Sequence, residues 1–297
     1  MLHFPVLLEE SVDFLITNLD GNYIDCTFGR GGHTSKILRK ISPEAKLTSF
    51  DKDAEAYEFA KNIKENNFTI KHESFNSLSK YFDEGSIDGI LYDLGTCSTH
   101  LDNGDRGFSF MRDGPLDMRF NIKKGKPLSD WINNASYDEI LNVLYSYGDE
   151  KHGKLIAKAI IDFREKKRIA TTFDLANLIK DCYPSLRKKI HPATKSFQAF
   201  RIFINNELNE IAESLQQAKK ILKKNGIIVV ISFHSLEDNL VKNFFKPQNL
   251  EFPKDIPINS IMSQEFKCIA KKIRATEDEI NVNPRSRSAI MRVFKKL

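Results

Sequence analysis

Short apolar runs alternate with amphipathic stretches along the first third of this chain. Runs of strand length lie at 23–26, 45–50, 68–72 and 88–93. Stretches with helical periodicity follow the first three of them, at 31–41, 53–65 and 76–82. Strands that alternate with helices at this spacing are typical of βαβ units. The pattern therefore predicts an α/β fold built on a mostly parallel sheet.

The next apolar run of this kind lies at 226–232, far beyond the fourth. One crossover helix needs a small part of that gap, so most of it is predicted to be an insertion. Apolar residues recur at helical spacing over 154–163 and again over 197–222, which predicts one long helix leading into the fifth strand. Two late strand candidates, 266–272 and 288–294, are predicted to close the sheet as an antiparallel pair.

The composition is that of a folded protein. The 297 residues exceed one typical hydrophobic core, and 41% of them are hydrophobic and 29% charged. The N-terminal stretch lacks a basic leader, and the longest unbroken apolar run, 226–231, is too short to span a bilayer. We therefore expect a cytoplasmic protein. The cysteines form no CxxC pair, so we expect reduced thiols and no metal site: Cys26, Cys97, Cys182 and Cys268.

The net charge of +5 is spread unevenly along the chain. Basic residues gather at 164–168, 187–201 and 284–297, interleaved with aromatic residues. One such run is usually a solvated surface, but three of them favour a phosphate-bearing partner. The candidate contacts for RNA lie in the second run: Lys188, Lys189, Lys195 and Arg201.

A glycine-rich bend, TFGRGGH at 27–33, directly follows the first predicted strand. Glycines at such a bend bring backbone N–H groups close to a ligand, and the helix that follows favours negative charge. The glycines do not form a complete GxGxxG, so a simple tight turn is the alternative. Asp51 ends the second predicted strand, where a carboxylate can accept the hydroxyls of a ribose. Both NAD and S-adenosylmethionine fit this pattern.

A second carboxylate, Asp93, ends the fourth predicted strand. Ligands of open parallel sheets bind at the carboxyl ends of the strands, where methyltransferases keep polar groups that face the substrate. A residue at this position can instead cap the following turn. No histidine with an acidic partner is placed for hydride transfer, which favours S-adenosylmethionine over NAD.

Several long segments resemble one family closely. They are HFPVLLEE, YIDCTFGRGGH, DGILYDLG, RGFSFMRDGPLDMRF, IHPATKSFQAFRIFINNEL, ISFHSLEDNLVK and NPRSRSAIMRVF, which together run from residue 3 to 294. Strings such as RGFSFMRDGPLDMR have no generic role in a nucleotide-binding fold. The chain thus resembles the bacterial 16S ribosomal RNA (cytosine-N4)-methyltransferase family.

The resemblance implies a Rossmann-like class I methyltransferase fold with a seven-stranded, mostly parallel sheet. It implies a methyltransferase domain over 1–104 and 201–297, interrupted by a helical substrate-recognition domain over 105–200. The cofactor it implies is S-adenosylmethionine. The residues it assigns to the cofactor are Gly31, Gly32, His33, Asp51, Phe75, Asp93 and His100.

This chain departs from the usual pattern of that family at three places. His100 stands where the family usually has glutamine, and Gly95-Thr96-Cys97-Ser98 stands where it has GVSS. Asn239 replaces the arginine that commonly follows SLED. Histidine keeps a hydrogen-bond donor and an acceptor, but the geometry and the pH dependence of the contact change.

The activity implied is N4-methylation of a cytidine in the decoding centre (P-site region) of 16S rRNA. Asp93 is the candidate to accept a hydrogen bond from the amino group, unless the cofactor occupies it. Phe108 and Phe110 are candidates to stack on the base, with core packing as the alternative. The partner is 16S rRNA or the small ribosomal subunit, with no membrane and no obligate protein partner.

One possible metal site and two other functions are weighed against the methyltransferase interpretation. His234, Glu237 and Asp238 resemble a metal cluster, but no second cluster supports one, so we expect no metal. An NAD-dependent oxidoreductase would leave the basic runs without a use. A non-catalytic RNA-binding protein on a nucleotide-binding fold is favoured by one feature, His100 in place of glutamine.

Overall fold

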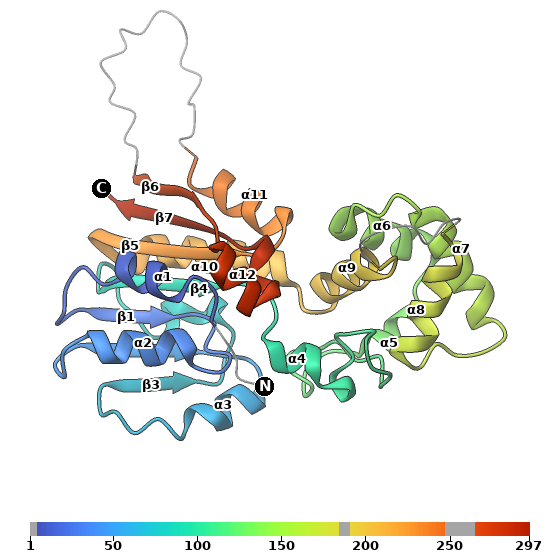
Figure 1. Ribbon diagram of the computed structural model, residues 1–297, viewed down its shortest axis with the longest axis horizontal. Coiled ribbons are helices and arrows are strands. Elements are labelled where there is room, and N and C mark those ends of the chain that lie inside the picture. Colours follow the sequence, from blue (N-terminus) through green and yellow to red (C-terminus); the bar gives the residue numbers. More distant parts are fainter. Residues whose placement is uncertain (1–4, 184–190, 247–264) are drawn as a thin grey trace, which may run out of the picture. The chain divides into compact units, whose positions relative to one another are not determined.

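The computed structural model describes residues 5–183, 191–246 and 265–297, which form two compact units. The first unit comprises Met1–Gly95 and Leu208–Leu297, and the second comprises Thr96–Glu207 (Figure 1). The predicted insertion, 105–200, lies inside the second unit. None of the helices that the structure describes is long and apolar enough to cross a membrane.

A seven-stranded sheet forms the centre of the first unit. Its strands are β1 (Asn22–Asp25), β2 (Lys46–Phe50), β3 (Phe68–Lys71), β4 (Ile87–Asp93), β5 (Leu222–Ser232), β6 (Phe266–Ile273) and β7 (Ile290–Lys296). Their order is β3-β2-β1-β4-β5-β7-β6. Strands β1 to β5 are parallel, and β7 is antiparallel to both β5 and β6. The predicted Rossmann-like α/β fold, with its late antiparallel pair, is confirmed.

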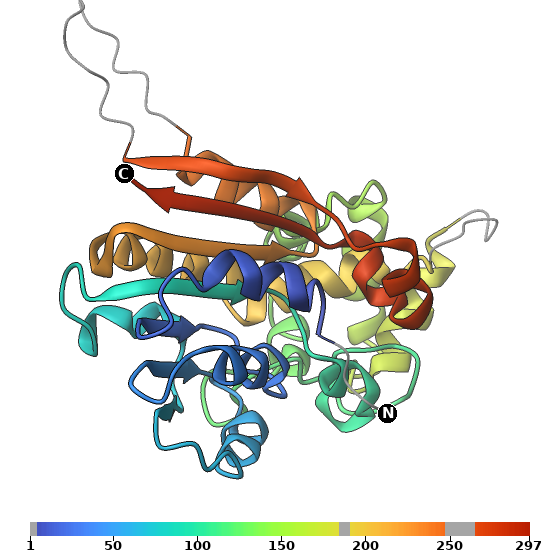
Figure 2. The ribbon, with the colours of Figure 1, turned by 60° about the vertical axis from the view of Figure 1, so that its left-hand side comes forward.

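Helices cover both faces of this sheet (Figures 1 and 2). The helical segments are α1 (Leu8–Leu15), α2 (Gly32–Lys40), α3 (Ala54–Ala60), η1 (Phe75–Lys80), α10 (Glu207–Ile221), α11 (Ser235–Phe244), α12 (Glu277–Val282) and η3 (Pro284–Ser288). Tyr23 and Leu91 join the core beneath α1 and α2. Ile24 and Ile90 join the core beneath α10 and α11. Successive strand residues thus serve opposite faces, which explains why the central strands are continuous apolar runs.

The second unit is helical over the residues that the structure describes. It contains α4 (Ser98–Asp102), η2 (Gly104–Arg106), α5 (Leu128–Ile132), α6 (Tyr137–Gly148), α7 (Gly153–Arg164), α8 (Thr172–Asp181) and α9 (Thr194–Ile204). Its core includes Met118, Leu144, Ile156 and Phe200, all fully buried. Capping boxes begin α6 and α8, where the Ser136 and Thr171 hydroxyls accept backbone N–H groups.

The predicted single helix over 197–222 is wrong. The structure ends α9 at Ile204 and begins α10 at Glu207, with Asn206 in a left-handed conformation at φ 51°. The Asn205 side chain accepts a hydrogen bond from the Phe120 N–H at 2.8 Å and donates one to the Met118 carbonyl at 2.7 Å. Asparagine tolerates the left-handed region and competes for backbone partners, so the helix breaks here although the apolar stripe continues.

The RGFSFMRDGPLDMRF segment folds into a tight loop that is held by its own backbone. The Arg106 guanidinium donates to the carbonyl groups of Arg119 and Phe120 at 3.2 and 3.0 Å. Gly107 has a φ of 73°, and a Cβ atom on it would lie 2.4 Å from the Pro115 carbonyl oxygen. The glycines of this segment therefore serve close backbone packing.

We expect Gly107→Ala to destabilise the second unit by more than about 3 kcal/mol, because both the positive φ and the clash with backbone must be relieved. Gly125→Ala is the matched control, because Gly125 has a φ of 69° with nothing within 4 Å of the added Cβ. It should cost only about 1 kcal/mol, the penalty of the left-handed conformation. Urea unfolding of both variants measures the difference, and equal destabilisation would show that backbone crowding is unimportant.

Candidate functional site

A glycine-rich bend follows β1 and leads into α2. Gly29 and Gly31 have φ angles of 56° and 72°, which residues with side chains rarely adopt. Gly32 opens α2, and a Cβ atom on it would lie 2.2 Å from Cγ of Pro5. No side chain among the described residues caps the N-terminus of α2. The bend can therefore present backbone N–H groups to an anionic or polar ligand at close range.

A buried carboxylate at the start of this bend was missed by the sequence analysis. Asp25 ends β1 and is fully buried. Its two oxygens accept hydrogen bonds from the Thr27 N–H at 3.1 Å and from the Thr34 hydroxyl at 2.7 Å. Burial raises the pKa of Asp25 to about 6, although the hydrogen bonds from Thr34 and Thr27 act in the opposite direction. The sequence signal for this arrangement is an acidic residue that ends a strand two positions before a threonine.

Asp93 lies at the carboxyl end of β4, which neighbours β1. Its backbone N–H donates to Oγ1 of Thr27 at 2.7 Å. Its side chain is 18% exposed, and Oδ2 lies 3.6 Å from Nδ1 of His33. Nε2 of His33 lies 3.1 Å from the Val6 carbonyl oxygen, which accepts a hydrogen bond and so requires the proton on Nε2. The Val6 carbonyl thus fixes the His33 ring through Nε2. A protonated His33 would pair with the Asp93 carboxylate through Nδ1.

Asp51 follows β2 and links the bend to the next loop. Its Oδ2 accepts a hydrogen bond from the Gly29 N–H at 2.8 Å, and its Oδ1 accepts one from the Asp53 N–H at 2.8 Å. Asp51 is therefore held in one orientation at the end of β2, the position from which an acidic side chain can accept the hydroxyl groups of a ribose.

Phe75 opens η1 after β3 and is partly buried. Its ring meets that of Tyr92 edge to face, with centroids 5.8 Å apart and an interplanar angle of 86°. Glu210 of α10 accepts a hydrogen bond from the Ser74 hydroxyl at 3.0 Å and pairs with Lys52 at 2.7 Å. These contacts fix the loops after β2 and β3, from which Asp51 and Phe75 project.

The first unit therefore gathers most of the predicted cofactor residues at or just beyond the carboxyl ends of β1 to β4. They are Gly31, Gly32, His33, Asp51, Phe75 and Asp93. His100 is the exception, because it belongs to the second unit.

His100 lies buried in an aromatic cluster of that unit. Its ring stacks on Phe108 and packs at a tilt against Phe120, with centroids 5.1 Å away in both cases, and its Nδ1 lies 3.3 Å from Sγ of Cys97. Burial acts to raise the pKa of the Cys97 thiol, but the hydrogen bond and the charge of His100 outweigh it and lower that pKa. The histidine that replaces the usual glutamine is thus paired with a cysteine that also departs from the family pattern.

The predicted RNA contacts lie in different surroundings within the second unit. Lys195 donates to the carbonyl and carboxylate oxygens of Asp149. Arg201 forms a two-point ion pair with Glu207, at 2.8 Å for both contacts. Phe108 is 5% exposed, whereas Phe110 is partly exposed and stacks on His191 with centroids 4.4 Å apart. Lys188 and Lys189 lie outside the described residues. An RNA role for this set stays a prediction.

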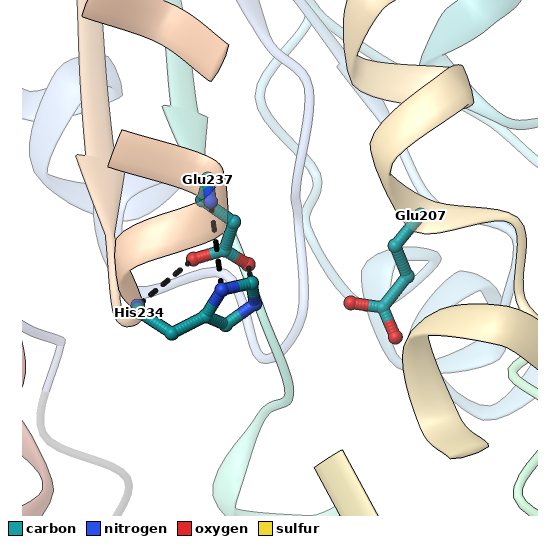
Figure 3. Close-up of side chains that lie close together, drawn as sticks. All are labelled: Glu207, His234 and Glu237. Atoms are coloured by element: carbon teal, nitrogen blue, oxygen red, sulfur yellow. Dashed lines mark hydrogen bonds and ion pairs between the residues drawn. The ribbon is translucent and has the colours of Figure 1, made fainter. Parts of the chain in front are cut away.

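Two residues of the metal-like cluster of the first unit, His234 and Glu237, form a capping box at the start of α11 (Figure 3). Nδ1 of His234 accepts the Glu237 N–H at 3.4 Å, and Oε2 of Glu237 accepts the Phe233 N–H at 2.8 Å. Asp238 pairs with Arg292 through contacts of 2.7 and 2.9 Å. His234 and Glu237 thus cap the N-terminus of α11, and Asp238 ties this helix to Arg292 of β7. Glu207, also drawn in Figure 3, belongs to the second unit and pairs with Arg201.

Comparison with known proteins gives one family. The model of the MraW methylase family matches residues 1–297. A curated relative from Coxiella burnetii (strain Dugway 5J108-111), named ribosomal RNA small subunit methyltransferase H, is 44% identical over 303 residues and covers 99% of each chain.

Solved structures resemble this chain more distantly. One is a protein from Clostridium thermocellum, provisionally named an rRNA methylase, with 12% identity, a TM-score of 0.47 and full coverage of both chains. Another is an rRNA methylase from Streptococcus thermophilus, with 10% identity and a TM-score of 0.44 over 100% of this chain and 99% of that one. At this distance, neither likeness carries an argument about function.

Asp25→Asn tests the buried carboxylate through pH dependence. Because the pKa of Asp25 is raised from 3.8 to about 6, the folded wild type keeps a proton between these pH values that the unfolded chain has released. Wild-type stability should therefore fall, relative to the variant, by up to about 3 kcal/mol as the pH rises from 4 to 7. Urea unfolding of both proteins at several pH values measures this, and parallel curves would contradict the raised pKa.

Proposed function

The chain belongs to the MraW methylase family, and we propose that it transfers the methyl group of S-adenosylmethionine to RNA of the small ribosomal subunit. The observation that carries the proposal is the set of groups at the carboxyl ends of adjacent parallel strands: the glycine bend, Asp51 and Asp93. Nucleotide-like ligands of open α/β sheets bind at this edge. The name of the Coxiella relative supports RNA of the small subunit as the substrate.

The residues of the first unit fit this cofactor. The N-terminus of α2 has no side-chain cap among the described residues, Asp51 lies at the end of β2 where a carboxylate can accept ribose hydroxyls, and Phe75 offers a partly exposed ring after β3. S-adenosylmethionine, when bound, supplies an electrophilic methyl group on a sulfonium centre. The protein contributes orientation, because its groups are fixed by hydrogen bonds before any ligand arrives.

We further propose that the accepting atom is the N4 amino nitrogen of a cytidine in the decoding centre (P-site region) of 16S rRNA, as the family resemblance of the motifs implies. The N4 lone pair is delocalised into the ring, so the site must hold the amine in line with the methyl group. A carboxylate that accepts one N4–H bond favours the more nucleophilic, pyramidal form of the amine. Asp93 is the candidate, because its carboxylate is partly exposed at the end of β4, where Thr27 holds the Asp93 backbone.

No strong base is required for this reaction, because the methylated ammonium product is itself acidic. Any ring that stacks on the target base must come from elsewhere, since the loop after Asp93 carries no aromatic residue before Phe108. Of the two predicted rings, Phe110 is the better candidate because Phe108 is buried between His100 and Phe120. Family membership favours this function over an NAD-dependent oxidoreductase or a non-catalytic RNA-binding protein.

Asp93→Asn separates catalysis from cofactor binding. If Asp93 accepts a hydrogen bond from the amine, the variant should lose roughly 100-fold in kcat while its affinity for S-adenosylmethionine changes little. The matched control is Asp88→Asn in the same strand, because Asp88 binds the Asn22 N–H and Lys223 at the opposite end of β4. Single-turnover methylation and cofactor titration give the two quantities. Weakened cofactor binding with unchanged kcat would assign Asp93 to the cofactor alone.

The proposed reaction itself is tested with small ribosomal subunits from cells that lack the enzyme. The purified protein is incubated with these subunits and methyl-labelled S-adenosylmethionine, and the RNA is digested to nucleosides. We expect the label in N4-methylcytidine derivatives at one position. Label in another nucleoside would refute the assigned atom. No label, from protein shown to bind the cofactor, would refute the proposed function.

A further inference from the structure

The NPRSRS segment has no part in the site described so far. It forms η3 and leads directly into β7, whose first residue, Ile290, pairs with Ser232 at the carboxyl end of β5. The last residue of β6, Ile273, pairs with Met291 at the same end. Asp93 at the end of β4 pairs with Ile231 near the end of β5. The connection between β6 and β7 therefore lies at the carboxyl ends of the parallel strands, where the predicted cofactor residues lie.

This connection is anchored and presents arginines to solvent. The Asn283 side chain accepts the Arg285 N–H at 3.2 Å, and the Ser286 hydroxyl donates to the Asn283 carbonyl at 2.8 Å. Ser286 is fully buried, whereas Arg285 and Arg287 on either side of it are exposed. Arg274, which follows β6, is exposed as well. We call Arg274, Arg285 and Arg287 the arginine edge.

The N-terminal segment connects this edge to the glycine bend through direct contacts. The Leu7 N–H donates to Oε1 of Glu279 in α12 at 2.9 Å. The neighbouring Val6 carbonyl contacts the His33 ring, and Pro5 packs against Gly32. Residues 5–7 thus touch α12 with one end and the cofactor bend with the other. The arginine edge flanks α12, with Arg274 before the helix and Arg285 and Arg287 after it, and is thereby placed beside the proposed methyl-transfer site.

The charge of the connection suits a polyanion. Lys271 and Lys272 at the end of β6 are exposed and extend the positive surface of the arginine edge. Acidic residues of α12 serve the fold: Glu279 binds the Leu7 N–H, and Glu277 and Asp278 lie in the first helical turn, where negative charge is favourable. Exposed arginines on an anchored turn contribute little to stability, but their guanidinium groups match phosphate oxygens in geometry and charge.

We propose that the arginine edge binds backbone phosphates of the substrate RNA and so sets its register on the first unit. The inference rests on the proposed function, because it takes RNA as the substrate. Phosphate contacts fix position without reading sequence, which is the role expected of cations beside a site that acts on one nucleotide. Exposed lysines on an edge strand such as β6 can also serve to prevent pairing with a strand of another molecule. Charge reversal at the arginines of η3, which lies outside any strand, tests RNA binding without affecting that protection.

The test compares two charge-matched double variants. Arg285→Glu with Arg287→Glu alters the arginine edge. Lys46→Glu with Lys224→Glu makes the same change in net charge on exposed residues at the opposite edge of the sheet, because Lys46 begins β2 and Lys224 lies near the start of β5. Binding to unmodified small subunits and to naked 16S rRNA is measured at several salt concentrations, together with affinity for S-adenosylmethionine.

We expect the arginine variant to bind RNA roughly tenfold more weakly and to lower the salt slope by about one for each phosphate that is no longer neutralised. Its cofactor affinity should match wild type, and the lysine variant should bind RNA nearly as wild type does. Equal weakening in both variants would mean that net charge alone matters and would overturn the inference.

The inference can fail separately from the proposed function. Wild-type protein that methylates the subunit, with an arginine variant that binds and methylates it equally well, would overturn the arginine edge alone. Wild-type protein that neither binds nor methylates the RNA would overturn both.

Discussion

The site depends on one buried carboxylate. Asp25 receives the Thr27 N–H on one oxygen and the Thr34 hydroxyl on the other, so it fixes both the beginning of the glycine bend and the first turns of α2. Thr27 in turn accepts the backbone N–H of Asp93. The ends of β1 and β4 are thereby joined through side chains as well as through the sheet. Burial disfavours the ionised form of Asp25, which is why its pKa is raised. The hydrogen bonds to the carboxylate partly offset this effect.

Much of the first unit could be predicted from local patterns. The central strands are buried on two faces, so they appear as uninterrupted apolar runs, and the turns between them carry glycine or acidic residues. Asp51 and Asp93 could be placed because a residue that ends a parallel strand must lie at the carboxyl edge, whatever its neighbours are. The runs also predicted the late antiparallel pair that closes the sheet, whereas the order of the strands was not predicted. Short-range information sufficed because these elements are short and strictly periodic.

The features that escaped prediction depend on residues distant in sequence. The apolar stripe over 197–222 continues across the break at Asn205, and that break is set by the backbone of Phe120 and Met118, far earlier in the chain. The importance of Gly107 appears only when Pro115 folds back against it. The resemblance assigns His100 to the cofactor, and that assignment stays a prediction, but its partners within the second unit, Cys97, Phe108 and Phe120, could not be predicted. None of these pairings has a periodic signal.

The N-terminal segment shows how distant parts of the first unit are made to depend on each other. Leu7 is fully buried and adopts a left-handed conformation at φ 52°, which costs a bulky residue about 1–2 kcal/mol. Such a conformation persists only where surrounding contacts impose it. Glu279 holds the Leu7 N–H, His33 contacts the adjoining carbonyl of Val6, and the Leu7 side chain lies in the core beneath α1. The strained residue therefore lies between the C-terminal connection, which Glu279 represents, and the cofactor bend, which His33 represents, and contacts on both sides hold it in place.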